Sequence, residues 1–547
     1  MSIVLALCLS VLTVPQAPPP TQGARVTEGP DDAPYYFIIG RYLEGEGKVD
    51  EAVAAFRKAI DLDPTSAEPR AELAALYARQ DKARESIDAA EDALKVDPKN
   101  REANRVLGTV LAALAEQRQR AHPGDDVSTY PKRAIAALEI ARGDGTGDLT
   151  IDLTLARLYL DQDRPADAVP LLRRIVTEQP QYAEGSALLA EAQEAAGAPD
   201  AAVETLKSVL EDQPQFFRGR VQLAEIYEHE LKWAEAADAW TGVQQLNPRN
   251  PEIATHLATA LMNAGKSAQA RDVIKDALAI SPNDIRLSFL MVQVQRETGD
   301  LDGALSTARS LRAAHPDDPR TTYLLGQMLL AKGRYDEVVD LMKPEVDRLR
   351  AADAAGAQVA LLETTQASAL LQLKRNDDAL ALLKDAVGRA PDDTTVLFQY
   401  GAALDRAGRT SDAENAFRNI ISKDPLDANA LNYLGYMMAE RGTSLDEAVT
   451  LIQRALKVEP NNPSYLDSLG WAYVQQGKLD LADTPLSTAA EKLPDNSVIQ
   501  EHLGDLRLKQ NRRADAIAAW QRALAGDMES VDRTKLQKKI DAAKKSR

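Results

Sequence analysis

One residue pattern recurs along this chain every 34 residues, and it restricts the possible folds more than any other feature of the sequence. A large residue is followed by an apolar residue and then by glycine or alanine, and an alanine and a proline come later at fixed distances. One regular copy has Leu466, Leu469, Gly470, Tyr473, Ala482, Leu486, Ala489 and Pro494. A chain with such a period folds by stacking similar units and not by enlarging one core.

Each copy of the pattern predicts two helices. The apolar residues recur at spacings of three and four, which places them on one helix face. Small residues such as Gly40 and Ala52 let the two helices approach closely, and a proline such as Pro98 ends the second helix because its ring cannot donate a hydrogen bond. Apolar residues make up 44% of the chain but aromatic residues only 5%, and alternating runs of strand formers are absent. The sequence therefore predicts an all-α fold.

Fourteen copies follow one another, and three of them are longer than the period. The third has about fourteen extra residues near 116–131, the ninth about seven near 343–359, and the twelfth one near Gly442. We expect the insertion in the third copy to protrude as a loop. The copies begin near residues 33, 67, 101, 149, 183, 217, 251, 285, 319, 360, 394, 428, 463 and 497.

The spacing and residue types resemble the tetratricopeptide-repeat (TPR) consensus over residues 33–530. The resemblance implies an α-solenoid, a right-handed superhelix of about fourteen helical hairpins. The first helices would then line a concave groove that fits an extended or convex protein surface. Residues 531–547 form a polar amphipathic segment, which predicts a C-terminal capping helix.

Positions 2, 5, 9 and 12 of each first helix should face the groove. In the fifth and sixth copies these positions are acidic, and in the last three they combine amides, aromatic rings and carboxylates. Trp471 could bind a partner or pack against the neighbouring first helix near Tyr436, whereas Trp240 and Trp520 occupy core positions of second helices. The predicted protein-binding residues are Asn429, Asn432, Tyr436, Asp467, Trp471, Gln475, Glu501 and Asp505.

The sequence contains no pattern typical of catalysis or of metal binding. The five histidines are far apart, and the stretch that begins Glu228-His229 has Trp233 where a zinc-peptidase helix needs its second histidine. We therefore predict a chain that is not an enzyme, with no cofactor and no metal. The net charge of −18 disfavours nucleic acid and anionic lipid as partners, because both repel an acidic surface.

The first 32 residues combine an apolar run, Ile3 to Val14, with a proline-rich linker. A run of this length is too short to span a bilayer but suits the core of a secretory signal. The first charged residue is Arg25, and Leu7 precedes Cys8 where a lipoprotein signal needs a small residue. We expect export to the periplasm or envelope, with contact to a membrane only through an N-terminal anchor. A cytoplasmic chain with a disordered start is the alternative.

A more specific resemblance covers about the last 120 residues. The stretches Leu431–Tyr436, Ser464–Trp471 and Glu501–Asp505 look like the C-terminal part of large bacterial envelope TPR proteins. These include lipoprotein adaptors that bind a periplasmic carboxyl-terminal processing protease. The resemblance implies a scaffold or adaptor whose protein partner is a periplasmic protease or an envelope assembly factor. A cytoplasmic chaperone-like or regulatory scaffold, or a TPR subunit of an enzyme complex, are the other interpretations.

Overall fold

The computed structural model describes residues 31–122, 124–143, 148–527 and 531–545. The predicted signal-like segment and linker, residues 1–32, lie almost entirely outside this part of the chain. Every regular element in the described residues is a helix. No helix among them is long and apolar enough to cross a membrane.

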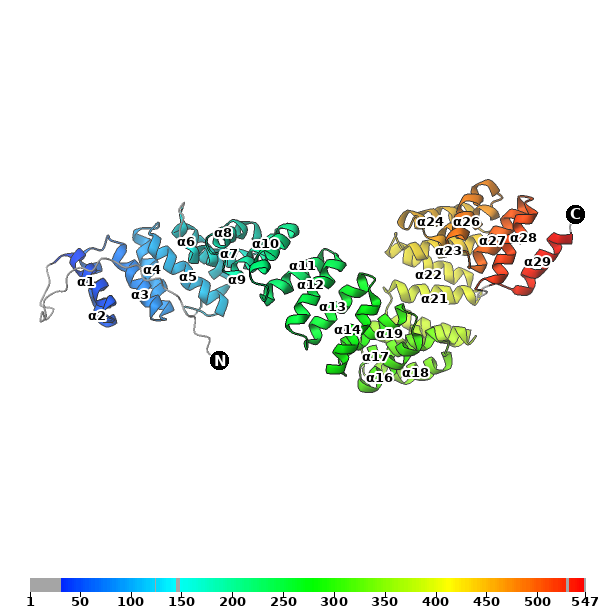
Figure 1. Ribbon diagram of the computed structural model, residues 1–547, viewed down its shortest axis with the longest axis horizontal. Coiled ribbons are helices and arrows are strands. Elements are labelled where there is room, and N and C mark those ends of the chain that lie inside the picture. Colours follow the sequence, from blue (N-terminus) through cyan, green and yellow to red (C-terminus); the bar gives the residue numbers. More distant parts are fainter. Residues whose placement is uncertain (1–30, 123, 144–147, 528–530, 546–547) are drawn as a thin grey trace. The chain divides into compact units, whose positions relative to one another are not determined.

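The first compact unit covers Met1–Lys266. Its helices follow one another as antiparallel neighbours, so that each first helix packs on its own second helix and on the hairpin before it (Figure 1). They are α1 (Ala33–Gly45), α2 (Val49–Leu62), α3 (Glu68–Arg79), α4 (Ala83–Val96), α5 (Arg101–Gln117), the 3-10 turn η1 (Val127–Thr129), α6 (Tyr130–Arg142), α7 (Leu149–Asp161), α8 (Pro165–Glu178), α9 (Ala183–Ala195), α10 (Pro199–Asp212), α11 (Phe217–His229), α12 (Trp233–Leu246) and α13 (Pro251–Asn263).

The second compact unit covers Ser267–Arg547 and is built in the same way. It comprises α14 (Ser267–Ile280), α15 (Ile285–Glu297), α16 (Leu301–Ala314), α17 (Pro319–Ala331), α18 (Tyr335–Ala351), α19 (Gly356–Gln372), α20 (Asn376–Arg389), α21 (Thr394–Arg406), α22 (Thr410–Lys423), α23 (Ala428–Arg441), α24 (Leu445–Val458), α25 (Pro463–Gln475), α26 (Leu479–Lys492), α27 (Ser497–Lys509), α28 (Arg513–Ala525) and α29 (Arg533–Lys545). The prediction of an all-α solenoid of about fourteen hairpins with one additional closing helix is confirmed.

The core follows the stripes that the repeat predicts. Trp240 and Trp520, which the sequence places in the core of second helices, are both buried. Several first helices have a glycine where the second helix of the same repeat approaches most closely. A Cβ atom on Gly504 would lie 2.4 Å from Cδ1 of Trp520, and one on Gly470 would lie 2.4 Å from Cγ of Leu486. Gly470 and Gly504 are therefore required by the packing of their hairpins.

This close approach predicts a loss of stability when Gly504 is replaced by valine. The rigid indole of Trp520 would have to move, and we expect the free energy of unfolding to fall by about 1–3 kcal/mol. Urea denaturation followed by circular dichroism measures the change. Gly388 is the matched control, because a Cβ atom there meets nothing within 4 Å. Gly388→Ala should leave stability unchanged or raise it by up to about 1 kcal/mol through better helix propensity.

The two long insertions are accommodated differently. In the third repeat α5 is extended to 17 residues, and the segment that follows is fastened by Tyr130, whose hydroxyl donates to Asp125 (2.5 Å) and accepts from the backbone N–H of Ala121 (3.0 Å). His122 lies 3.0 Å from Asp88 of α4. In the ninth repeat the extra residues lengthen helices, so that α18 and α19 have 17 residues each.

Consecutive first helices contact one another directly, for example α3 with α5 and α23 with α25. Within each unit, the described second helices make no comparable contacts with one another. The first helices are therefore closer together, which places them on the inner side of each stack. We call the solvent-facing surface that they form the first-helix face.

Candidate protein-binding face

Trp471 lies at the centre of the predicted binding residues and connects three first helices. Its ring, on α25, stacks on the imidazole of His502 on α27, with centroids 4.2 Å apart and planes 13° apart. Its Nε1 donates a hydrogen bond to Oε2 of Glu440 on α23, at 3.1 Å. The side chain remains partly exposed. Trp471 therefore packs sideways and also presents part of its ring to solvent.

His502 forms a buried ion pair beneath this ring. Its Nδ1 lies 3.0 Å from both carboxylate oxygens of Asp467, and both side chains are more than nine-tenths buried. Burial lowers the pKa of His502, but the nearby carboxylate of Asp467 and, more weakly, those of Glu440 and Asp505 outweigh it and raise the pKa above its usual value. Asp467, expected at the groove surface, instead holds α27 against α25.

Tyr436 of α23 lies against the same cluster. Its ring centroid is 6.3 Å from that of His502. Burial, followed by the charges of Glu440 and Asp467, raises the pKa of the Tyr436 phenol. Its side chain is partly exposed, like that of Trp471, so Tyr436 supports the cluster and also contributes to its surface.

The three predicted amides are placed differently from one another. Asn429 is exposed and accepts a hydrogen bond from the hydroxyl of Tyr465, at 2.9 Å. Asn432 is partly buried, and its Oδ1 accepts no hydrogen bond from the described residues. Gln475, one turn after Trp471 on α25, is exposed. Asn429 and Gln475 are thus the amides that an incoming protein can reach directly.

Glu501 and Asp505 are occupied by the capping helix α29. Nζ of Lys539 lies 2.6 Å from Oε1 of Glu501 and 2.6 Å from Oδ2 of Asp505. Asp505 also accepts a hydrogen bond from Nε1 of Trp520, at 3.0 Å. Burial lowers the pKa of Lys539, but its hydrogen bonds to Asp505 and Glu501 outweigh that effect and raise it. The structure therefore joins these two carboxylates to the cap and not to the cluster around Trp471.

The acidic face predicted in the fifth and sixth repeats carries its own counter-charges. Arg218 lies 2.9 Å from Glu184 and 3.1 Å from Glu191. His229 lies 2.8 Å from Glu194, and His256 lies 3.1 Å from Glu228. Of the predicted acidic residues only Glu225 lacks an ion pair within the described part of the chain, and burial raises the pKa of its carboxyl group.

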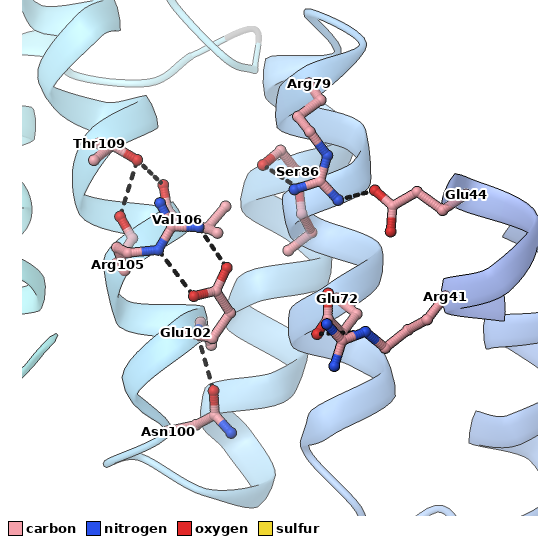
Figure 2. Close-up of polar contacts among 12 residues, drawn as sticks. Arg41, Glu44, Glu72, Arg79, Ser86, Asn100, Glu102, Arg105, Val106 and Thr109 are labelled. Carbon is pink, nitrogen blue, oxygen red and sulfur yellow. Dashed lines mark hydrogen bonds and ion pairs between the residues drawn. The ribbon is translucent and has the colours of Figure 1, made fainter. Parts of the chain in front are cut away.

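The first three repeats show how charge is balanced on this face (Figure 2). Arg41 of α1 reaches Glu72 of α3 at 3.8 Å, and Arg79 of α3 pairs in the opposite direction with Glu44 of α1. Burial raises the pKa of Glu72, and the charge of Arg41 opposes that rise. The first helices α1 and α3 are thus linked by reciprocal ion pairs.

Many of these links join residues about one repeat apart in sequence, at separations of 34 to 36 residues. Our sequence reasoning missed His502 as a functional partner, although a search for opposite charges at this separation would have found it. The pairs are Glu44 with Arg79, Glu184 with Arg218, Asp405 with Arg441, Asp467 with His502, and Asp505 with Lys539.

The described residues do not have the arrangement that a metal site requires. They contain no group of three or more histidine, cysteine, aspartate or glutamate side chains placed to hold a metal ion. The polar contacts on the first-helix face join one helix to the next. These contacts hold the side chains of the face in fixed positions.

Three family models match separate parts of the chain. Two that are described as tetratricopeptide repeat cover residues 159–226 with 230–294, and 286–424, and one described as TPR repeat covers residues 46–81. This chain is a tetratricopeptide-repeat protein. TPR solenoids generally mediate protein–protein interactions and generally act as non-catalytic scaffolds.

Two bacterial proteins are similar to part of this TPR chain. A TPR repeat-containing protein of Pseudomonas aeruginosa is 33% identical over 179 residues, which are 32% of this chain and 29% of that protein. Cellulose synthase operon protein C of Xanthomonas axonopodis pv. citri is 32% identical over 163 residues, which are 29% of this chain and 10% of that protein. The chain thus spans less than a third of the length of either relative.

Solved structures with similar helical arrays include two that cover nearly the same length. The Cut9–Hcn1 hetero-tetramer of the APC/C is 14% identical, with a TM-score of 0.39, over 93% of this chain and 96% of that chain. Yeast Tom70 is 14% identical, with a TM-score of 0.31, over 94% of this chain and 95% of that chain.

Proposed function

We propose that this TPR protein is a non-catalytic adaptor that holds a partner protein on the first-helix face of α23 and α25. The observation that carries the proposal is the partly exposed ring of Trp471, which is fixed by Glu440 on one side and His502 on the other. A fixed aromatic ring loses little conformational entropy on binding, and tryptophan contributes strongly to protein interfaces. Gln475, one turn after Trp471 on α25, and Asn429, at the start of α23, add exposed hydrogen-bonding groups on the same two helices.

The proposed setting is the bacterial cell envelope, and the proposed partner is a periplasmic carboxyl-terminal processing protease or an envelope assembly factor. The apolar run in the first 32 residues and the resemblance of the last 120 residues support this setting. The two relatives described above, from Pseudomonas aeruginosa and Xanthomonas axonopodis, are also bacterial proteins. Cell fractionation combined with the mass of the mature N-terminus tests it. An intact Met1 in the cytosolic fraction would favour the cytoplasmic scaffold instead.

A photo-crosslinking amino acid at position 475 tests the binding face. Gln475 is exposed beside Trp471, so we expect it to capture the partner in cells. The matched control is position 457, where Lys457 is also exposed but lies on the second helix α24. Equal capture at the two positions, or capture only at 457, would contradict the proposed face.

Removal of the indole gives an independent test. Trp471→Ala should lower recovery of the partner from an envelope extract about tenfold or more, as expected for a residue that dominates an interface. Circular dichroism and the urea midpoint establish that the variant is folded. Undiminished recovery with a folded variant would show that the partner binds elsewhere.

A further inference from the structure

His502 of α27 joins the partly exposed ring of Trp471 to a buried carboxylate. One face of its imidazole lies on the indole, with ring centroids 4.2 Å apart and planes 13° apart. Its Nδ1 lies 3.0 Å from both carboxylate oxygens of Asp467. His502 is 7% exposed and Asp467 is 6% exposed, whereas Trp471 reaches the surface. A change of charge on His502 therefore acts directly on the indole of the proposed binding face.

The groups around this imidazole are mainly acidic. The titratable groups that face it are Asp467 of α25, Glu440 and Tyr436 of α23, and Asp505 of α27 itself. The charged side chains that link α27 to α26, α28 and α29 form other pairs, which are Asp483 with Arg507, Arg522 with Gln500, and Lys539 with Glu501 and Asp505. The surroundings of His502 thus favour its protonated form.

The two charge states of His502 differ in how firmly they hold the ring of Trp471. A protonated imidazole attracts the face of the indole through a cation–π interaction and neutralises the buried charge of Asp467. Without the proton both attractions weaken, and Trp471 keeps the hydrogen bond from its Nε1 to the exposed Glu440, at 3.1 Å. Burial lowers the pKa of His502, but the carboxylate of Asp467, with smaller contributions from more distant carboxylates, outweighs burial and raises it. The change of charge therefore falls above about pH 6.5.

We propose that the proton on His502 fixes Trp471 in its binding position and that loss of this proton frees the indole. Where it concerns binding, the inference rests on the proposed function, because the partner must contact Trp471. A partner held there should bind about two- to fivefold more tightly when His502 is charged, as expected for one cation–π contact near the surface. The binding face would then respond to pH, and binding would weaken as the pH rises.

Fluorescence of Trp471 tests the proposal in the purified full chain. The emission of the wild type minus that of Trp471→Phe reports this residue alone, because the other tryptophans are common to both proteins. A charged imidazole quenches a stacked indole more strongly than a neutral one does. We expect the difference emission to rise from about pH 6 to about pH 9, with a midpoint above the ordinary histidine pKa of about 6.5. Quenching of this emission by acrylamide should increase over the same range, because a freed ring is more accessible.

Three variants, each paired with its own version that also carries Trp471→Phe, assign the pH response to His502. His502→Gln should abolish it, and Asp467→Asn should lower its midpoint by about one pH unit or more, because the histidine loses its nearest anion. His256→Gln is the matched control and should leave the response unchanged, because His256 also stacks on an indole, but on that of Trp240 in the first unit, with centroids 4.6 Å apart. A wild-type difference emission that does not change with pH would overturn the proposal, as would an unchanged response in His502→Gln or an unchanged midpoint in Asp467→Asn.

A failure of this inference is distinguishable from a failure of the proposed function. If Trp471→Ala lowers recovery of the partner from an envelope extract but the Trp471 emission does not change with pH, the control by His502 is overturned and the adaptor function stands. If the emission changes with pH as expected but Trp471→Ala leaves recovery undiminished, His502 does control the indole and the partner binds elsewhere.

Discussion

Glu363→Ala is expected to lower the free energy of unfolding of the second unit by about 3 kcal/mol. Glu363 of α19 is completely buried, and its Oε1 accepts hydrogen bonds from Arg350 at 2.9 and 2.5 Å. Arg389 of α20 lies 3.4 Å from the same oxygen. Loss of the carboxylate leaves two guanidinium groups without their buried partner. They are about one-third exposed, which keeps the cost at the lower end of the range for a broken buried pair.

The measurement is urea denaturation followed by circular dichroism. Glu447→Ala is the control, because Glu447 and Arg418 form an ion pair in which both side chains are more than a third exposed. Such pairs contribute about 0–1 kcal/mol. If Glu363→Ala and Glu447→Ala lowered the free energy of unfolding equally, burial would not explain the contribution of Glu363 to stability.

The second large effect concerns the pH dependence of the ion pair between His502 and Asp467. The pKa of His502 is raised in the folded chain, so the pair stabilises the fold fully below the ordinary histidine pKa of about 6.5. This stabilisation is lost as the pH rises through the raised pKa of the folded state. The urea midpoint of the wild type should therefore fall on going from about pH 6 to about pH 9.

His502→Gln should remove this part of the pH dependence. At pH 6 it should also cost about 2–3 kcal/mol, because Asp467 would then be buried without its cationic partner. His229→Gln is the control, since His229 is paired with Glu194 but is 71% exposed. The urea midpoints of the wild type, His502→Gln and His229→Gln, measured from about pH 6 to about pH 9, test this prediction. A slope in His502→Gln that matches the wild type would show that other groups cause the pH dependence.

The sequence was sufficient for the fold because the 34-residue period sets both the helix pairs and their contacts. Gly470 and Trp520 could be assigned to hairpin packing from their positions alone, and the structure places both there. The period also located the insertions, because they interrupt it. It did not reveal that the ninth repeat lengthens α18 and α19, since an insertion forms a helix or a loop according to its tertiary contacts.

The candidate site was harder to predict than the fold. The position of a residue within a repeat indicates on which helix face its side chain lies, but not which neighbouring side chain it contacts. The sequence therefore predicted Asp467 and Trp471 as groove residues but did not indicate their contacts with His502. It likewise predicted Glu501 and Asp505 but did not indicate their contacts with Lys539. Each of these pairs depends on the register between neighbouring first helices. The binding role of the predicted residues itself remains a prediction.

Two buried carboxylates were also missed, and they have a common setting. Asp152 of α7 is bound by Arg142 (2.8 Å) and Arg174 (3.0 Å), much as Glu363 is bound by Arg350 and Arg389. Both carboxylates lie on the first helix after a repeat with a long insertion, at junctions that lack the usual closing proline. An arginine from each flanking second helix fixes the junction there. The repeat pattern could not predict this arrangement, because both examples occur where an insertion interrupts the pattern.

The links at one-repeat separation have a consequence for how this array could change during evolution. Repeats of one length look interchangeable, yet each first helix is matched to the residues of its neighbours. Excision of the thirteenth repeat would bring His502 opposite Asn432, an uncharged amide, in place of Asp467. Duplication or loss of a single repeat would thus leave charged side chains without partners. To restore the ion pairs, both residues of each pair at the new junction would have to change together. The order of the repeats is therefore constrained by these pairs.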